Sequence, residues 1–275
     1  MNDEPGQIKI RLLGVLTAYL DGTQVTPSAA KQRQILALLA LNSGRVVTIG
    51  TLVEELWGDR PPRSSATTLQ TYVMQLRNRL AEAAPGSPWA RGLLRTQHGG
   101  YMLEEAACRT DIDEFGRLSL AGRAAAETGD YRAAAERLGH ALALWRGPAL
   151  ADVRLGCVLE LEATSLEETR LGVLERRIEA DLALGRHADL LGELTLLTAR
   201  NPMNENFCAL LMTALYRSGH VERALKAYHR VRTVLRDELG IEPYPRLRRL
   251  QRAILSGDPA LESGPRGRHA AALSN

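Results

Sequence analysis

Several signatures of enzymes are missing from this chain of 275 residues, in which lysines and aromatic side chains are also scarce. Only three of its 35 basic residues are lysines, and none of the three follows a glycine, so the chain lacks the Gly-Lys pair of a phosphate-binding loop. No two glycines lie two or four positions apart, which excludes the G-x-G-x-x-G and G-x-S-x-G motifs. H-E-x-x-H is absent, and the six histidines are scattered. We therefore expect a protein that is not an enzyme.

Cysteines and long apolar runs are few as well. Cys108, Cys157 and Cys208 form no C-x-x-C pair, which argues against a disulfide framework and against a zinc site. Residues 64–76 make the longest charge-free run, whose 13 residues fall short of the roughly 18 that a membrane helix needs. The first residues are acidic, unlike the basic start of a secretory signal. We expect no metal, no cofactor and no membrane contact, and a cytoplasmic, nucleoid-associated protein.

Basic charge is concentrated in the first third of the chain. Residues 1–103 have 11 basic and 7 acidic side chains, whereas residues 104–275 have 24 and 25. Within residues 60–103 there are six arginines and a single carboxylate, Glu82. A solvated surface usually mixes both signs, so this basic strip indicates a polyanionic partner.

The order of predicted elements in the first third is also informative. Residues 8–26 alternate in short apolar runs broken by Asp21-Gly22, which predicts a small antiparallel sheet with a tight turn. Residues 31–42 and residues 49–57, the latter after a candidate N-cap at Thr48, have helical spacing, and a third helix begins near residue 64. Residues 93–103 form a hairpin around Gly99-Gly100. A sheet, three helices and a final hairpin predict an α+β winged helix-turn-helix domain.

The third predicted helix has an outer face of short polar and amide side chains. Its apolar residues Leu69, Val73, Leu76 and Leu80 turn inward, so the opposite face presents Thr67, Thr68, Thr71, Met74, Gln75 and Asn78, flanked by Arg77 and Arg79. Glutamine can pair with adenine, and threonine methyls can contact thymine methyls. A merely solvated helix also presents a polar face. The absence of any carboxylate between residues 60 and 81 favours contact with DNA.

From residue 111 onward the sequence predicts helices only. Gly185 and Gly219 are 34 residues apart, the tetratricopeptide period, and this frame places Ala224 and Tyr228 at the small and aromatic packing positions. Gly129 begins an earlier unit at an offset of 56 residues, so a longer helix over about residues 159–184 must absorb the excess. We expect an all-α, tetratricopeptide-like stack of helices.

Several passages resemble one family. "TLVEELWGDRPPRSSATTLQTYVMQLRNRL" followed by "LLRTQHGGYML" resembles the OmpR-type DNA-binding domain, in the version found in the Streptomyces antibiotic regulatory protein family. "ALALWRGPALADV", "LMTALYRSGHVERALKAYHRVRTVLRDELGIEP" and "LRRLQRAIL" resemble the bacterial transcriptional activator domain that follows it in that family. The matches cover about residues 8–261. They agree with a winged-helix domain at residues 1–107, a tetratricopeptide-like activator domain at 108–261 and a disordered tail at 262–275.

The resemblance implies a set of DNA-binding residues. Thr67, Thr68, Thr71 and Gln75 align with major-groove positions, Arg77 and Thr96 with phosphate-contacting residues, and Trp57 with a tryptophan whose indole N–H reaches a phosphate. His98 aligns with an arginine that many relatives insert into the minor groove, and a mostly neutral imidazole is attracted less strongly there. Arg63 and Arg79 of the basic strip complete the predicted set. Core packing explains Trp57 equally well, and a plain turn explains Gly99-Gly100.

The leading hypothesis is a sequence-specific DNA-binding transcriptional activator. Two copies lying side by side in one orientation would read direct repeats spaced about 10 to 11 base pairs. The resemblance implies secondary-metabolite (antibiotic) biosynthesis genes as targets. It also implies contact with the RNA polymerase holoenzyme, including its principal sigma factor, near the promoter −35 region.

Two alternatives remain open from the sequence. The chain could be a tetratricopeptide adaptor whose N-terminal domain docks protein, or a regulator that senses a small molecule on the concave face of its helical stack. A response regulator controlled by phosphorylation is disfavoured because the winged-helix domain starts at about residue 8.

Overall fold

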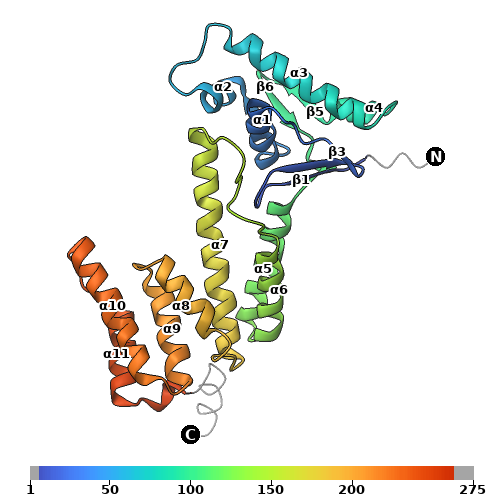
Figure 1. The fold of residues 1–275 in the computed structure, drawn as a ribbon. Helices are drawn as coiled ribbons and strands as arrows, with labels where there is room; N and C mark the ends of the chain where they lie inside the picture. Colours follow the sequence, from blue (N-terminus) through green and yellow to red (C-terminus); the bar gives the residue numbers. More distant parts are fainter. Residues whose placement is uncertain (1–5, 263–275) are drawn as a thin grey trace. The chain divides into compact units, whose positions relative to one another are not determined.

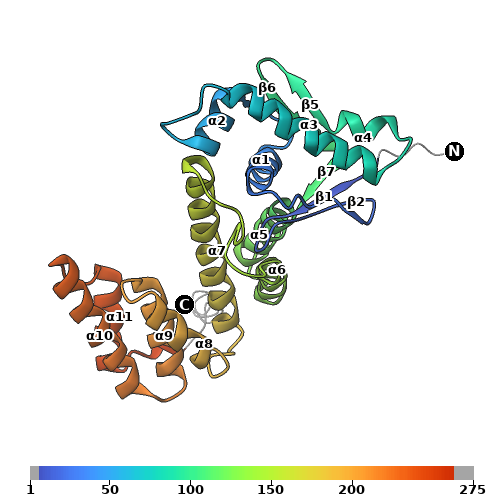
Figure 2. The same cartoon turned by 45° about the horizontal axis from the view of Figure 1, so that its top comes forward.

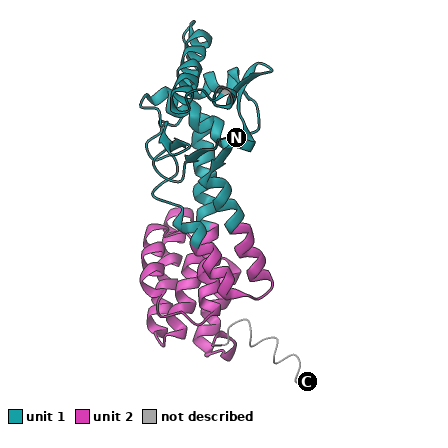
Figure 3. Cartoon of the chain, turned by 90° about the vertical axis from the view of Figure 1, so that its right-hand side faces the viewer, with its two compact units in different colours: residues 1–118, 140–171 teal, residues 119–139, 172–275 magenta. Residues whose placement is uncertain are grey.

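The computed structural model describes residues 6–262, so the tail predicted to be disordered lies, except for Glu262, outside the described residues. The described part forms two compact units, shown in Figure 3. The first combines the chain up to residue 118 with residues 140–171, and the second combines residues 119–139 with the chain from residue 172 onward. The sequence predicts a boundary between a winged-helix domain and an activator domain at residues 107 and 108. This boundary is distinct from the division into compact units and stays a prediction.

A four-stranded sheet opens the first unit (Figure 1). Its strands are β1 (Ile8–Arg11), β2 (Thr17–Leu20), β3 (Thr23–Gln24) and β7 (Cys108–Thr110), in the order β3-β2-β1-β7. Asp21 and Gly22 connect β2 to β3 with φ angles of 48° and 87°, the left-handed pair that a tight two-residue hairpin turn requires. The predicted turn is therefore confirmed, whereas the parallel strand β7 was not predicted.

Three helices and a second sheet complete the winged-helix part of this unit. The helices are α1 (Ala30–Leu41), α2 (Ile49–Trp57) and α3 (Ser65–Ala83), as the sequence predicts, and Thr48 caps α2 by accepting the Thr51 N–H. The second sheet has the order β4-β6-β5, formed by β4 (Val47–Thr48), β5 (Leu94–Gln97) and β6 (Gly100–Leu103). Strand β4, helix α4 (Pro88–Gly92) and the 3₁₀ turn η1 (Glu105–Ala107) were not predicted.

The segment between residues 144 and 156 belongs to the first unit because it hydrogen-bonds to the β1–β2 connection. The Arg146 and Leu150 N–H groups donate to the carbonyls of Leu13 and Leu12, each at 2.9 Å. Asp111 accepts the Leu12 and Leu13 N–H groups at 2.7 and 3.1 Å. These bonds join residues about 100 to 140 positions apart in the sequence, a pairing that no local pattern signals.

Between β7 and residue 262, the last that the structure describes, there are seven α-helices. They are α5 (Asp111–Glu127), α6 (Tyr131–Ala143), α7 (Cys157–Ala183), α8 (Leu191–Arg200), α9 (Glu205–Arg217), α10 (Val221–Leu239) and α11 (Pro245–Ser256), followed by the 3₁₀ turn η2 (Pro259–Leu261). Gly129, Gly185 and Gly219 lie between helices with φ angles of 79°, 82° and 77°. The 27-residue α7 is the long helix that the irregular repeat spacing predicts.

In the second unit, α9 packs against α8, α10 and α11. Ala224 and Tyr228 of α10 are buried, as expected for their places in the repeat. Cys108 of the first unit and Cys208 of the second are buried, which raises the pKa of each thiol to about 12, whereas Cys157 is exposed; none of the three forms a disulfide. Within residues 6–262 no helix is both long and apolar enough to cross a membrane.

Candidate nucleic-acid interface

Helices α2 and α3 form the helix-turn-helix. Helix α2 ends at Trp57, and a seven-residue connection over residues 58–64 leads to α3; its first residue, Gly58, has a φ of 61° that reverses the chain. All four apolar residues predicted to face inward on α3 are buried: Leu69, Val73, Leu76 and Leu80. Figures 1 and 2 show α3 on the outer side of α1, so the face of α3 opposite these four residues is directed away from the rest of the first unit.

The outward face of α3 carries the predicted base-reading residues. Thr67, Thr71, Gln75 and Asn78 are exposed, and Thr68 is half-buried at the edge of the face. Met74 is 54% exposed in the middle of it. The Thr71 hydroxyl donates to the Thr67 carbonyl at 3.1 Å, and the methyl group of an exposed threonine can contact a thymine methyl.

Gln75 is oriented by a residue that sequence reasoning missed. Its carbonyl Oε1 accepts a hydrogen bond of 2.5 Å from Nε2 of Gln32, a side chain of α1 that is only 8% exposed. The amide NH₂ of Gln75 is left without a protein partner among the described residues. A carbonyl oxygen has a second lone pair, so Gln75 retains both groups that bidentate pairing with adenine requires.

Arg77 and Thr96, predicted to bind phosphate, are brought together. The Arg77 Nε donates to the Leu94 carbonyl at 2.8 Å, and its Nη2 donates to Thr96 Oγ1, also at 2.8 Å. The guanidinium carbon lies 5.9 Å from the centroid of the Tyr101 ring. Arg77 thus fastens α3 to strands β5 and β6, and only its remaining N–H groups can reach a phosphate.

Trp57 is half-buried at the end of α2, where Lys31 of α1 covers its ring. The Lys31 ammonium lies 5.5 Å from the centroid of that ring and donates to the Leu56 carbonyl. Burial, followed by repulsion from Arg154, lowers the pKa of Lys31. Lys31 was not among the predicted site residues, although it is one of only three lysines in the chain.

The wing hairpin turns at His98-Gly99, one residue before the predicted Gly99-Gly100. His98 and Gly99 have φ angles of 45° and 76°, and Gln97 pairs with Gly100 across the turn. Gly100 itself lies in strand β6, where an added Cβ would lie 2.3 Å from the Val47 carbonyl oxygen. The two positions therefore require glycine for different reasons: Gly99 adopts the left-handed conformation of the turn, and Gly100 leaves room for β4 to lie close to β6. His98 is exposed at the tip.

The basic strip is largely free of compensating acids. Of its described arginines, Arg95 pairs with Glu104 at 2.9 Å. Arg60, Arg63, Arg77 and Arg79 make no ion pair among residues 6–262. Arg63 is exposed and Arg79 half-buried. This unneutralised charge surrounds the outward face of α3 and favours a polyanion there.

Glu55 of α2 connects the helix-turn-helix to the start of α7. It is only 2% exposed, and its carboxylate accepts the N–H groups of Gly156, Val158 and Leu159 at 2.6, 3.0 and 3.0 Å. The first turn of a helix has unsatisfied N–H groups and a partial positive charge, which a carboxylate stabilises. An added Cβ on Gly156 would lie 2.1 Å from the Glu55 carbonyl oxygen. The sequence offered one signal for this buried carboxylate: Glu55 is an acidic residue between two apolar helix positions, Leu52 and Leu56.

Comparison with known proteins identifies the family. Residues 23–103 match the model of the C-terminal domain of transcriptional regulatory proteins, and residues 110–255 match the bacterial transcriptional activator domain. Regulatory protein DnrI of Streptomyces peucetius is 49% identical over 261 residues, which cover 94% of this chain and 96% of that protein. The chain belongs to the Streptomyces antibiotic regulatory protein family.

Other relatives are proteins of which this chain matches only a part. Regulatory protein AfsR of Streptomyces coelicolor is 38% identical over 94% of this chain, but the match covers 25% of AfsR. The structure of Mycobacterium tuberculosis EmbR in complex with a low affinity phosphopeptide has a TM-score of 0.85 and 35% identity, covering 94% of this chain and 68% of that chain. The predicted fold, a winged helix-turn-helix followed by a helical activator domain, is confirmed, and the chain is a transcriptional activator.

Proposed function

We propose that the chain activates secondary-metabolite (antibiotic) biosynthesis genes by binding their promoters in a sequence-specific way. The observation that carries the proposal is the outward face of α3, with exposed Thr67, Thr71 and Gln75, no carboxylate between residues 60 and 81, and flanking Arg77 and Arg79 that make no ion pair among the described residues. Helix α3 would lie in the major groove, where these side chains meet base edges.

Phosphate contacts would fix the position of the domain on the duplex. We assign them to Trp57, Arg63, Arg77, Arg79 and Thr96, with His98 at the minor groove. The Lys31 ammonium beside Trp57 adds positive charge to this edge. Because His98 replaces an arginine, we expect the wing to contribute less than the helix does.

Two copies on one promoter would bind direct repeats about 10 to 11 base pairs apart, close to one helical turn of DNA. We propose that the pair lies near the −35 region and recruits the RNA polymerase holoenzyme with its principal sigma factor. Membership in a family of transcriptional activators supports this function and a role other than catalysis.

Footprinting combined with base substitution tests the proposal. Gln75→Ala should weaken binding to the promoter duplex by roughly 5- to 150-fold, because a good bidentate base contact contributes about 1 to 3 kcal/mol. It should also relax the preference at one base position in each repeat. The matched control is Gln70→Ala, an exposed glutamine of the same helix outside the predicted set, which should leave affinity unchanged. Equal effects of the two variants would contradict the assignment of α3.

The adaptor alternative predicts a different outcome. There, a variant combining Gln75→Ala with Arg79→Ala would bind the promoter duplex like the wild-type chain while losing a protein partner. Arg79 is the better second position because Arg77 also holds strand β5.

A further inference from the structure

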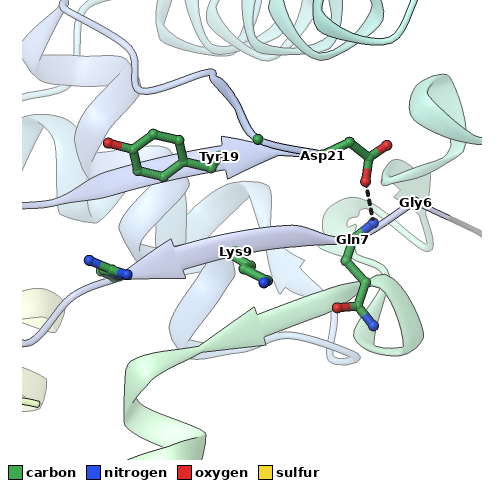
Figure 4. A pocket seen from close by; sticks show the side chains of 7 residues that line it. Gly6, Gln7, Lys9, Tyr19 and Asp21 are labelled. Carbon is green, nitrogen blue, oxygen red and sulfur yellow. Dashed lines mark hydrogen bonds between the residues drawn. The ribbon is translucent and has the colours of Figure 1, made fainter.

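A second basic surface lies on the outer face of the sheet β3-β2-β1-β7. Strand β1 alternates buried Ile8 and Ile10 with exposed Lys9 and Arg11. Arg109 of β7 is exposed on the same face, and Tyr19 of β2 is half-buried beside Lys9. Figure 4 shows Lys9 and Tyr19 on adjacent strands within this surface. We call these four residues, Lys9, Arg11, Tyr19 and Arg109, the basic sheet face.

Like charges are adjacent on this face without compensation. Lys9 lies directly opposite Arg109 in the parallel register of β1 and β7. Like charges at directly opposite positions destabilise a sheet. Neither Lys9, Arg11 nor Arg109 makes an ion pair among residues 6–262. An anionic partner bound to this face would reduce the repulsion between these positive charges, so the face is suited to bind an anion.

The basic sheet face borders a shallow cavity of about 750 Å³. It is lined by Gly6, Gln7, Lys9, Arg11, Tyr19, Asp21 and Gly22. Asp21, the acidic residue among these, accepts the Gln7 N–H at 3.1 Å, as drawn in Figure 4, and so caps one end of the hollow. Lys9 and Arg11 are two residues apart in a strand, about 6.6 Å, which is also the spacing of alternate side chains in an extended peptide.

The promoter duplex bound to α3 is not the anion that this surface fits. Figures 1 and 2 place α1 between α3 and the sheet. Buried side chains of the sheet point toward this interior, so the alternate side chains Lys9, Arg11 and Tyr19 point away from it. A straight duplex on the outward face of α3 therefore leaves the basic sheet face open.

We propose that the basic sheet face docks an extended acidic segment of another protein that runs along β1, with carboxylates at alternate positions on Lys9 and Arg11, and with Arg109 and Tyr19 on either side of Lys9. The proposal rests on the proposed activator function, in which a DNA-bound regulator must still contact a protein. It adds to that function a contact surface and the chemistry of the partner.

The test uses the full chain saturated with promoter duplex, so that α3 is occupied. The probe is a fluorescent twelve-residue peptide of alternating Glu and Thr, titrated by anisotropy. The test variant combines Lys9→Gln, Arg11→Gln and Arg109→Gln; the control combines Arg246→Gln, Arg249→Gln and Arg252→Gln on α11, another arginine-rich surface. Loss of three exposed ion pairs should weaken peptide binding about tenfold in the test variant. The control should change it less than about twofold.

Promoter affinity is measured on the same variants. We expect it to stay within about twofold in both, while the test variant loses transcription from the promoter with purified polymerase. Unchanged peptide affinity in the test variant would overturn the proposal, as would a tenfold loss of promoter affinity, which would make the face a DNA contact. Loss of a dimer in sedimentation, with transcription unchanged, would overturn it in favour of a second copy of the chain. If the wild-type chain bound the peptide but no promoter, the proposed function would fail while the surface remained.

Discussion

Removal of the Glu55 carboxylate should destabilise the first unit strongly. Glu55→Ala deprives the N–H groups of Gly156, Val158 and Leu159 of an acceptor that lies within 2.6 to 3.0 Å of each. A hydrogen bond to a charged group contributes about 1.5 to 3 kcal/mol, so three would give at most about 9 kcal/mol. Water that enters the space left by the side chain would accept hydrogen bonds from some of the three N–H groups. The three hydrogen bonds are also not independent, so their contributions do not simply add. We expect a loss of about 3 to 5 kcal/mol in the free energy of unfolding.

Urea unfolding followed by circular dichroism measures this loss, with the slope of the transition checked for constancy. Glu55→Gln keeps an oxygen acceptor without the charge and should cost about 1 to 2 kcal/mol. Glu54→Ala is the matched control, since Glu54 is an exposed neighbour in the same helix, and it should change stability by less than about 0.5 kcal/mol. A loss below about 1 kcal/mol for Glu55→Ala would refute the view that this carboxylate caps α7.

Other substitutions have equally definite outcomes. Gly100→Ala should cost more than about 2 kcal/mol in thermal unfolding, because its Cβ would lie 2.3 Å from a backbone oxygen; an unchanged melting temperature would contradict this. Gln32→Ala removes the hydrogen bond that holds Oε1 of Gln75 and so leaves the Gln75 side chain free to rotate. It should weaken promoter binding, measured by anisotropy, by a few-fold, while circular dichroism should show that the domain stays folded. Phe115→Ala removes a ring that is 2% exposed and 5.5 Å from Trp145, and should cost about 3 to 5 kcal/mol in urea unfolding. A smaller loss would mean that the site collapses around the cavity.

Local chemistry made much of the winged-helix fold predictable. Asp21-Gly22 has the backbone preference of a two-residue turn, and four apolar residues at helical spacing define the buried side of α3. Both features depend on neighbours in the sequence. The order of a sheet, three helices and a hairpin also followed from the residue pattern; the family resemblance agreed with it, and the comparisons show the family.

Features that depend on distant partners could not be predicted. Strands β4 and β7 have two and three residues, too few to show a period, and they exist because β6 and β1 pair with them. The turn was placed one residue late because a glycine pair indicates a turn equally well at either position, whereas Gly100 is required by the approach of β4. Glu55 and Gln32 act through residues that only the fold brings near.

The salt dependence of promoter binding tests the central claim most directly. Four arginines of the basic strip, Arg60, Arg63, Arg77 and Arg79, have no ion pair among the described residues. If the three assigned to phosphates, Arg63, Arg77 and Arg79, each contact one, the logarithm of affinity should fall with the logarithm of salt at a slope of about −2.7 per copy, or roughly 40-fold between about 50 and 200 mM salt. Arg79→Gln should reduce the slope by about 0.9, while Arg252→Gln on α11 should not change it. A slope near zero, or one that Arg79→Gln leaves unaltered, would contradict the account.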